Sequence, residues 1–187
     1  MVTVNEVLAD TDSRMKRSVE ALTSELSSIR TGRATPALVE NLMVDYYGVP
    51  TPLNQLSTIS VPEARVLLIQ PWDKEALKDV EKGILKSDLG LVPNNDGSAI
   101  RVNIPIPTEE RRRELVRLVG RAVEDALVAM RNIRRDGLER FRQLEKDKEL
   151  SRDEGKRAQD QLQRLTDSHA ERLDALRGEK EVEVMEV

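Results

Sequence analysis

The sequence contains no cysteine, which excludes disulfide bonds, thiolate nucleophiles and cysteine-ligated metal sites. Aromatic residues make up only 2% of the 187 residues, so leucine, valine, isoleucine and alanine must fill the core. No apolar run approaches the length of about 18 residues that a membrane-spanning helix needs. The N-terminal segment lacks a basic stretch followed by an apolar one, so no secretory signal is predicted and a cytoplasmic protein is expected.

Neither sign of charge dominates the sequence. Lysine and arginine number 30, aspartate and glutamate number 34, and the formal net charge is -4. Any contact with nucleic acid must therefore come from a local basic patch rather than from the total charge. Charged residues reach 34%, and this abundance combined with few aromatics is typical of long, solvated helices.

Three segments have the apolar periodicity of long helices. The first, 4–30, carries Leu8, Met15, Val19, Leu22, Leu26 and Ile29 on one face. The second, 108–150, begins at a capping Thr108, and its apolar seam contains Leu115, Val119, Val123, Ala126, Met130, Ile133, Gly137, Phe141 and Leu144. The third begins at the capping box of Ser151 and Glu154, with a seam of Ala158, Leu162, Leu165, His169, Leu173 and Leu176. Because no such helix can bury its stripe alone, a three-helix bundle is predicted.

The chain between the first two long helices has a different pattern. Short β-prone runs are expected at Leu42–Tyr47, Ser57–Val61, Val66–Gln70 and Ala99–Ile104. The Gly48–Pro52 segment is expected to break the chain, and Asn94–Gly97 is predicted to form a turn. One helix is expected to begin after Asp73 and to stop near Gly90, and its apolar side would consist of Leu77, Val80, Ile84 and Leu85.

The first long helix must pack against two helices that come much later in the chain. Residues 31–105 are therefore predicted to form an inserted α/β domain, while 1–30 and 106–187 form the bundle, giving an α+β fold. The chain crosses between the domains twice, and the residues expected at the crossings are Arg30, Thr31, Gly32, Ile104, Pro105, Ile106 and Pro107. Two short connections fit a hinge, but proline also stiffens a linker, so the same residues fit a rigid elbow.

The sequence has few of the residues that catalysis or metal binding needs. His169 is the only histidine, and it lies on an apolar seam where a packing role is expected. A lone histidine without cysteine cannot build the usual zinc site. Neither a Gly-x-Gly-x-x-Gly motif nor a P-loop is present. We therefore expect no enzyme, no cofactor and no metal site.

An arginine-rich stretch of the second long helix is the clearest functional signal. At about 100° per residue, Arg131, Arg135 and Arg142 share a narrow arc that points away from the apolar seam, and Arg134 lies to one side. Every basic residue in the range 87–145 is arginine. Guanidinium groups bind phosphate bidentately and stack on bases, so these four side chains are predicted to bind RNA.

A salt-bridged outer face is the alternative interpretation of this stretch, because Asp136 and Glu139 stand among the arginines. A second basic cluster contains Arg111, Arg112, Arg113, Arg117 and Arg121. The acidic residues Glu109, Glu110 and Glu114 balance it, so it is predicted to be mainly structural.

Several segments together resemble ribosome recycling factors. They are Ile29–Ala34, Asp45–Gly48, Thr51–Leu53, Ser87–Leu91 with Pro93 and Asn94, Thr108–Arg112, and Arg131–Arg135. They span essentially the whole chain in the family's order and spacing. The Pro105–Thr108 segment departs from the Pro-x-Leu-Thr pattern of many relatives, and Gly137 stands where they often have alanine. A glycine inside a helix costs about 1 kcal/mol and is expected to soften it there.

The resemblance implies a monomeric, L-shaped molecule with a tRNA-like outline. Such a factor binds the post-termination 70S ribosome and, with elongation factor G and GTP, splits it into subunits. By this resemblance the bundle contacts large-subunit ribosomal RNA, and Arg134 occupies the critical position beside Arg131 and Arg135. Arg30 and Arg33 match further basic positions near the hinge. The small domain would face elongation factor G, and no membrane or DNA partner is expected.

Two other classes of protein fit parts of the pattern. A coiled-coil adaptor or co-chaperone would bridge proteins through its apolar seams or its inserted domain, and it would not sediment with ribosomes. A sequence-specific DNA-binding protein is disfavoured by the acidic total charge and by the absence of a helix-turn-helix.

Overall fold

The computed structural model of the chain describes residues 2–186, and two compact units divide them. The helices are α1 (Val4–Ser28), α2 (Leu77–Lys86), α3 (Glu109–Lys146) and α4 (Arg152–Met185). The strands are β1 (Met43–Tyr46), β2 (Val49–Pro52), β3 (Ser57–Glu63), β4 (Val66–Pro71), β5 (Pro93–Asn95) and β6 (Ile100–Asn103). The first unit comprises Met1–Thr31 and Thr108–Val187, and the second comprises Gly32–Pro107.

A side-chain cap starts each long helix, and the caps of α3 and α4 are those predicted from the sequence. Thr3 and Glu6 form a capping box at the start of α1, and Ser151 and Glu154 form one at the start of α4. Thr108 accepts a hydrogen bond from the backbone N–H of Arg111 at the start of α3. These bonds satisfy backbone donors that the first helical turn leaves without partners, so the chain enters each helix at a defined residue.

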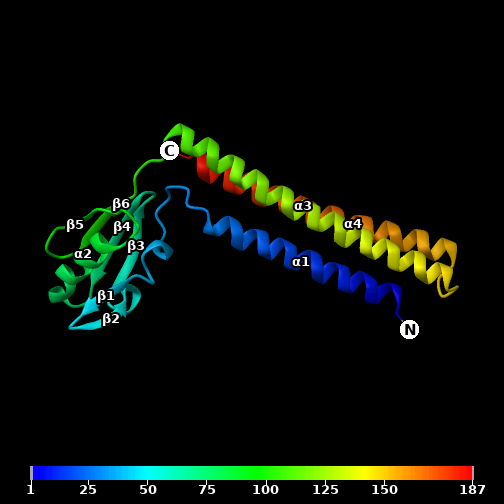
Figure 1. Cartoon of the computed structure of the whole chain (residues 1–187), viewed down its shortest axis with the longest axis horizontal. Helices are drawn as coiled ribbons and strands as arrows, with labels where there is room; N and C mark the ends of the chain where they lie inside the picture. The colour runs from blue at the N-terminus through cyan, green and yellow to red at the C-terminus, as the bar shows by residue number, and fades with distance from the viewer. Residues whose placement is uncertain (1, 187) are drawn as a thin grey trace. The chain divides into compact units, whose positions relative to one another are not determined.

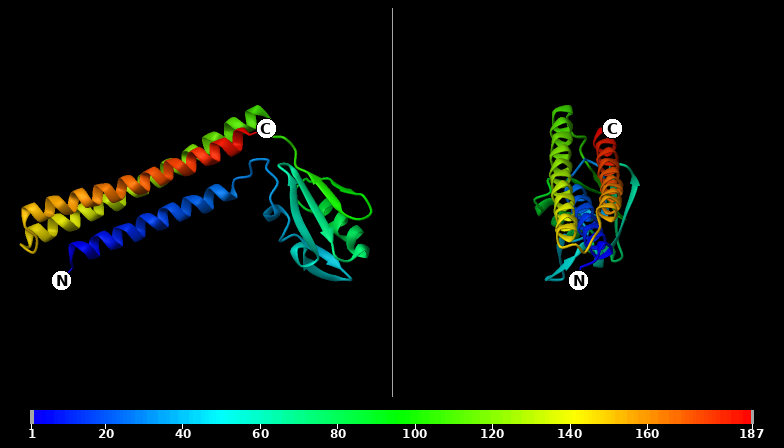
Figure 2. Two further views of the ribbon diagram at one scale, coloured as in Figure 1. Left: turned by 180° about the vertical axis from the view of Figure 1, so that it is seen from behind. Right: turned by 90° about the vertical axis from the view of Figure 1, so that its right-hand side faces the viewer.

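The helices α1, α3 and α4 run side by side and bury a shared apolar seam (Figures 1 and 2). Near the end of the bundle that contains the α3–α4 turn, the core is built from Val7, Phe141, Leu144, Ala158 and Leu162. Farther along, it contains Met15, Leu22, Leu26, Val119, Ala122, Val123, Ala126, Met130, Ile133, Leu173 and Leu176. All of the α3 seam residues named from the sequence are buried. The predicted three-helix bundle and α+β fold class are confirmed.

The second unit packs one helix and two antiparallel sheets around its own core (Figure 1). Strands β1 and β2 form a hairpin, and the other sheet has the order β3-β4-β6-β5. Tyr47 and Gly48 both have positive φ, 48° and 82°, as a two-residue hairpin turn with the right-handed strand twist requires. The core includes Val44, Leu53, Leu67, Ile69, Val80, Ile84, Ile100 and Val102.

Four local predictions in this unit are wrong. Asn94 and Asn95, which were expected in a turn, lie in strand β5 and pair with β6. The Gly48–Pro52 segment does not simply break the chain, because Val49–Pro52 pairs with β1 as strand β2. Edge-strand pairing tolerates proline, and period-two alternation did not reveal it. Leu85 is 58% exposed rather than buried with Leu77, Val80 and Ile84. The helix ends at Lys86 with Ser87 as its C-cap, ahead of Gly90.

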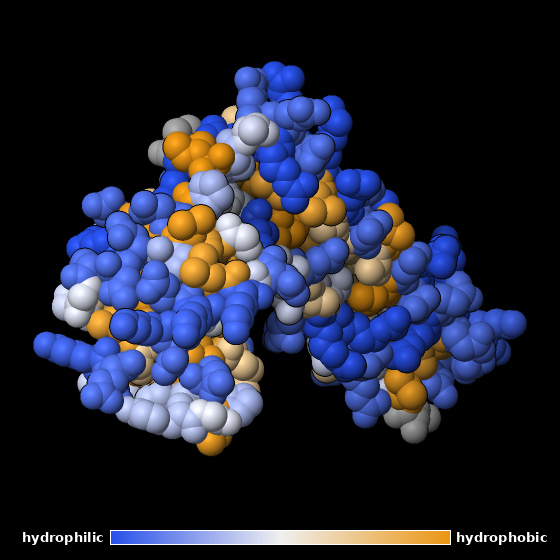
Figure 3. Space-filling view, turned by 60° about the vertical axis from the view of Figure 1, so that its left-hand side comes forward, coloured by the Kyte–Doolittle hydropathy of each residue, from blue (hydrophilic) through white to orange (hydrophobic). Residues whose placement is uncertain are grey.

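Hydrophilic side chains cover most of the surface seen in Figure 3, and hydrophobic residues emerge between them as separate patches. The exposed hydrophobic residues include Tyr47, Val49, Trp72, Val92 and Val182. Within residues 2–186, no helix combines the length and the apolar character that a bilayer crossing needs.

Candidate RNA-binding face and domain crossings

The predicted arginine face lies on the outer side of α3. Arg131, Arg135 and Arg142 are exposed, whereas Ile133 and Gly137 on the opposite side of the helix are buried. Arg134 is half-buried because it lies at the edge of the seam. The four guanidinium groups therefore extend from a helix whose inner side is held by the bundle core.

Acidic neighbours engage two of these four arginines. Arg131 donates to Glu124 at 3.2 Å, and Arg142 donates to Glu139 at 3.4 Å. All four of these side chains are more than half exposed, so water and salt screen both pairs. Among the described residues, Arg134 and Arg135 form no ion pair.

Asp136, which was the other candidate for neutralising this face, points to a different helix. Its carboxylate accepts a hydrogen bond from Arg14 of α1 at 3.0 Å. Arg140 likewise reaches Asp10 of α1 at 2.9 Å. These two pairs join α1 to α3, and they leave the outer side of α3 with an excess of guanidinium groups.

The second basic cluster divides into paired and unpaired members. Arg111 pairs with Glu114 at 2.9 Å, and Arg113 pairs with Glu109. Arg117 and Arg121 are exposed and form no ion pair among residues 2–186. Sequence reasoning treated this cluster as balanced because it counted acidic residues without knowing which arginines they reach.

The first crossing is anchored on both sides. Thr31 is 6% exposed, and its hydroxyl donates to Glu183 of α4 at 2.7 Å. Glu183 also pairs with Lys180, which is only 8% exposed. On the other side, the N–H of Ala34 donates to the carbonyl of Ala64 at 2.9 Å. Thr31 thus belongs to the bundle and Ala34 to the inserted unit.

The second crossing is similarly short. Ile104 is 9% exposed, and its N–H donates to the carbonyl of Arg65 at 2.8 Å, so it belongs to the inserted unit. Thr108 already caps α3. The residues between these anchors are Pro105, Ile106 and Pro107, and Ile106 is 59% exposed.

Gly32 and Pro107 bring the two crossings together. Gly32 has a φ of +84°, and a Cβ at this position would lie 2.7 Å from Cδ of Pro107. Only glycine satisfies both conditions without strain. Arg30 and Arg33, the predicted basic residues of this region, are both exposed.

His169 has the satisfied packing role that its place on the seam predicts. Its Nε2 lies 2.7 Å from Oδ1 of Asp12, and Lys16 donates to the other carboxylate oxygen of Asp12 at 2.9 Å. Hydrogen bonds from Lys16 and then from His169 hold the pKa of Asp12 below its ordinary value of 3.8. The described residues contain no cluster of three or more potential metal ligands.

The inserted unit carries an exposed aromatic group that the sequence did not single out. Tyr47 and Trp72 are each 67% exposed. The Tyr47 hydroxyl donates to Glu75 at 3.1 Å and to Asp73 at 3.2 Å, and Tyr46 also donates to Asp73. These bonds raise the pKa of Tyr47 to about 12, and the bond to Glu75 contributes more than the bond to Asp73.

Comparison with known proteins gives a consistent result across the chain. The family described as ribosome recycling factor matches residues 22–185. A ribosome-recycling factor from Geobacillus kaustophilus strain HTA426 is 57% identical over 182 residues, which cover 97% of this chain and 98% of the relative. One from Dehalococcoides mccartyi strain 195 is 50% identical over 184 residues, with coverage of 98% and 100%.

Two solved structures are also similar over nearly the full length. A solution structure of the ribosome recycling factor has a TM-score of 0.73 at 43% identity and covers all of both chains. The T. thermophilus ribosome recycling factor, placed with E. coli elongation factor G on the E. coli post-termination complex, has a TM-score of 0.64 at 47% identity and covers 99% of this chain and all of its own. With its capped three-helix bundle, its inserted unit and these matches, the chain belongs to the ribosome recycling factor family.

Proposed function

We propose that this protein binds the post-termination ribosome and, together with elongation factor G and GTP, promotes its dissociation into subunits. The observation that carries the binding step is the pair of guanidinium groups on Arg134 and Arg135, which have no carboxylate partner among the described residues. The similar T. thermophilus factor, placed with elongation factor G on the post-termination complex, supports the choice of partners.

Large-subunit ribosomal RNA is the proposed ligand of the arginine face. Phosphate oxygens accept two parallel hydrogen bonds from one guanidinium group, and an unpaired arginine offers them without first losing an internal partner. Arg131 and Arg142 join this contact by exchanging an exposed carboxylate for phosphate, which costs little because surface pairs contribute only about 0–1 kcal/mol. Arg30 and Arg33 extend the proposed basic surface toward the first crossing.

The remaining step is mechanical. The bundle core holds α3 straight, so a force applied to the inserted unit is transmitted to the RNA contact through the two crossings. Of the predicted crossing residues, the proposed hinge keeps Gly32 on one side and Pro105, Ile106 and Pro107 on the other, because hydrogen bonds anchor Thr31 and Ile104. GTP hydrolysis takes place on elongation factor G, and no covalent bond of this protein changes.

Substitution of Arg134 tests the proposal directly. Arg134→Ala should weaken binding to 70S ribosomes by about 1–3 kcal/mol, the usual cost of losing a charged hydrogen-bonding group, and should slow splitting with elongation factor G and GTP. Arg140→Ala is the matched control because Arg140 is on the same helix and is already paired with Asp10. Co-sedimentation across a salt series would measure the affinity, and light scattering would measure splitting.

Binding that is strong in the parent and weakens steeply with salt is the expected result. If Arg134→Ala and Arg140→Ala behave alike, the arginine face is not the ribosome contact. If the parent itself fails to sediment with ribosomes, or binds them without dependence on salt, the adaptor class gains support and the proposed function fails.

A further inference from the structure

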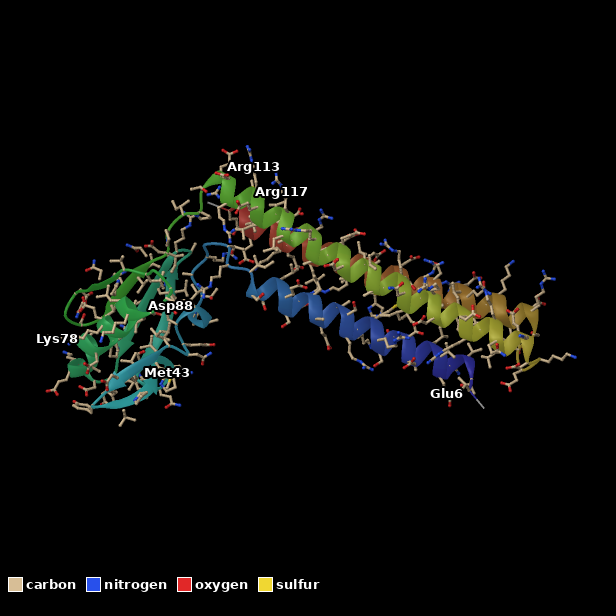
Figure 4. All side chains as sticks on the ribbon, in the orientation of Figure 1. Glu6, Met43, Lys78, Asp88, Arg113 and Arg117 are labelled. Carbon is tan, nitrogen blue, oxygen red and sulfur yellow. The ribbon has the colours of Figure 1, made fainter. Side chains whose placement is uncertain are left out.

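Arg117 and Arg121 lie on the same outward arc of α3 as Arg131 and Arg135. Arg117 and Arg131 are about four helical turns apart, as are Arg121 and Arg135. The two members of each pair therefore point in nearly the same direction from the helix axis. Figure 4 shows Arg117 extending from the start of α3 on the side that faces away from α1. Both residues are exposed, and neither forms an ion pair among residues 2–186.

A third guanidinium group approaches these two from α4. A Cβ at Gly120, one turn from Arg117 along α3, would lie 3.6 Å from Nη2 of Arg177, so the Arg177 side chain reaches α3 at Gly120. Glu181 holds Arg177 in place by accepting a hydrogen bond from its Nε at 3.0 Å. Glu181 bonds only Nε of Arg177, so the two outer nitrogens have no hydrogen-bond partner among the described residues.

We propose that Arg117 and Arg121, with Arg177 beside them, form a second phosphate-binding site for the same RNA. This inference rests on the proposed function and adds a contact region to it. The two sites are about 21 Å apart along a helix that the bundle keeps rigid. A fixed spacing selects a ligand whose phosphates are themselves fixed in space, so the ligand class is structured, base-paired RNA rather than a flexible single strand.

Chemistry favours phosphate over an acidic protein surface as the ligand. All basic residues of this part of α3 are arginines, whose planar forks match phosphate geometry. The same side of α3 carries Glu110, Glu114 and Glu124. Glu114 already accepts from Arg111 and Glu124 from Arg131, and Glu110 forms no ion pair with Arg117 or Arg121 among the described residues. The positive charge of Arg117 and Arg121 is therefore not offset by direct contact within the described residues.

A double substitution with a matched control tests the second site. Arg117→Ala with Arg121→Ala removes two unpaired arginines, whereas Arg111→Ala with Arg113→Ala removes the same charge from two arginines that already have carboxylate partners. The probe is the vacant large ribosomal subunit, titrated with the full-length protein across a salt series. Circular dichroism would verify that both variants keep the helical content of the parent.

The first double variant should bind at least about tenfold more weakly than the parent at low salt. The slope of log affinity against log salt concentration should fall by about 1.4–1.8, because each phosphate contact contributes about 0.7–0.9. The affinity of the control variant should stay within about threefold of that of the parent. It loses only two surface ion pairs, which water and salt already screen. Equal behaviour of the two double variants would overturn the inference.

Because the natural chain has no cysteine, a cross-linking experiment can identify the ligand. Leu118 is 40% exposed beside Arg117, so Leu118→Cys carries a photoreactive label there and leaves both arginines intact. Cross-links to RNA that unlabelled parent competes away support the second site, while cross-links only to ribosomal protein contradict it. If Arg134→Ala weakens binding but the Arg117 and Arg121 variant does not, the second site alone fails. If Arg134→Ala has no effect either, the proposed function fails with it.

Discussion

At the scale of single residues, the function of each arginine depends on what its guanidinium group already contacts. Arg131, Arg134 and Arg135 are close in the sequence and chemically identical, yet within residues 2–186 only Arg131 of the three has a carboxylate partner. That partner, Glu124, lies two turns away on the same outward arc. On the proposed function, an RNA phosphate would compete with Glu124 for Arg131, whereas it would meet no such competitor at Arg134 or Arg135 among the described residues.

Removing this competitor should strengthen ribosome binding. Glu124→Gln releases Arg131 and removes a negative charge that would repel RNA phosphates from the proposed contact. The affinity for ribosomes should therefore rise by up to about 1 kcal/mol at low salt. The control is Glu179→Gln, which frees Arg172 on α4 outside the proposed contact. Ribosome co-sedimentation measures both variants. An unchanged or weaker affinity for Glu124→Gln would show that Arg131 does not reach phosphate.

Tyr47 provides a titration that reports directly on its local contacts. Its hydroxyl donates to Glu75 and Asp73, and these bonds raise its pKa to about 12 from the ordinary 10.0. Deprotonation would place a phenolate beside two carboxylates. Whatever stability the bonds add is therefore complete below about pH 10 and is lost as the pH rises through about 12. Tyrosinate absorbance measures this titration.

Substitution of the two acceptors supplies the control for that titration. Asp73→Asn combined with Glu75→Gln removes both negative charges, so the pKa of Tyr47 should return toward 10.0. Circular dichroism over the same pH range would ensure that the protein stays folded. A parent chain whose two tyrosines both titrate near pH 10 while folded would contradict the hydrogen bonds to the carboxylates.

At the scale of helices, two glycines show how local packing decides whether an added side chain would stabilise or destabilise the bundle. Gly137 is buried where α1 and α4 approach α3, and a Cβ there would lie 3.1 Å from Leu162 and 3.3 Å from Thr11. The sequence suggested that this glycine softens the helix, but its contacts show that it allows close helix packing. Gly178 lies in α4 with open space around its Cβ position.

Opposite effects on stability are expected at these positions. Gly178→Ala should raise the free energy of unfolding by about 0.5–1 kcal/mol, because alanine favours the helix and meets no neighbour. Gly137→Val should lower it by about 1–3 kcal/mol through overpacking against Leu162 and Thr11. Urea denaturation followed by circular dichroism measures both changes. A stabilising Gly137→Val would mean that the three helices separate there at little cost.

At the scale of the whole molecule, the proposed function assigns the two crossings the task of passing a force from one unit to the other. Hydrogen bonds anchor Thr31 to the bundle, and Ala34 and Ile104 to the inserted unit. Gly32 lies against Pro107 between these anchors. On the proposed function, connections as short as these would transmit the force and would also be the place where a rotation occurs.

Gly32→Ala should perturb the crossings without unfolding either unit. The added Cβ would collide with Pro107. The backbone here also has a φ of +84°, which is unfavourable for alanine, so the crossings must rearrange. We expect slower ribosome splitting with elongation factor G, near-parental binding to ribosomes and little change in helical content. Gly48→Ala is the comparison, since it also has a positive φ but has no atom near its Cβ position. Equal splitting by both variants would contradict a mechanical role for the crossings.

Much of the fold follows from local sequence signals, and particular residues show why. Thr3, Thr108 and Ser151 cap helices through bonds to residues three positions away, and apolar periodicity is visible in any window of a few turns. Strand β2 was missed because two prolines mask its pairing with β1. Leu85 was predicted to be buried because it is apolar, but the tertiary packing decides which side of α2 is covered, and Leu85 lies outside it.

The sequence by itself determined the three long helices, the caps at Thr108 and Ser151 and the outward direction of the arginine arc, because all of these depend on contacts within a few turns of chain. The tertiary structure decided which charges remain unpaired. Asp136 and Asp10 are withdrawn to pairs that join α1 to α3, and Glu183 holds Thr31 from the far end of the chain. These pairings depend on the angle and distance at which whole helices pack, which no short window of sequence contains.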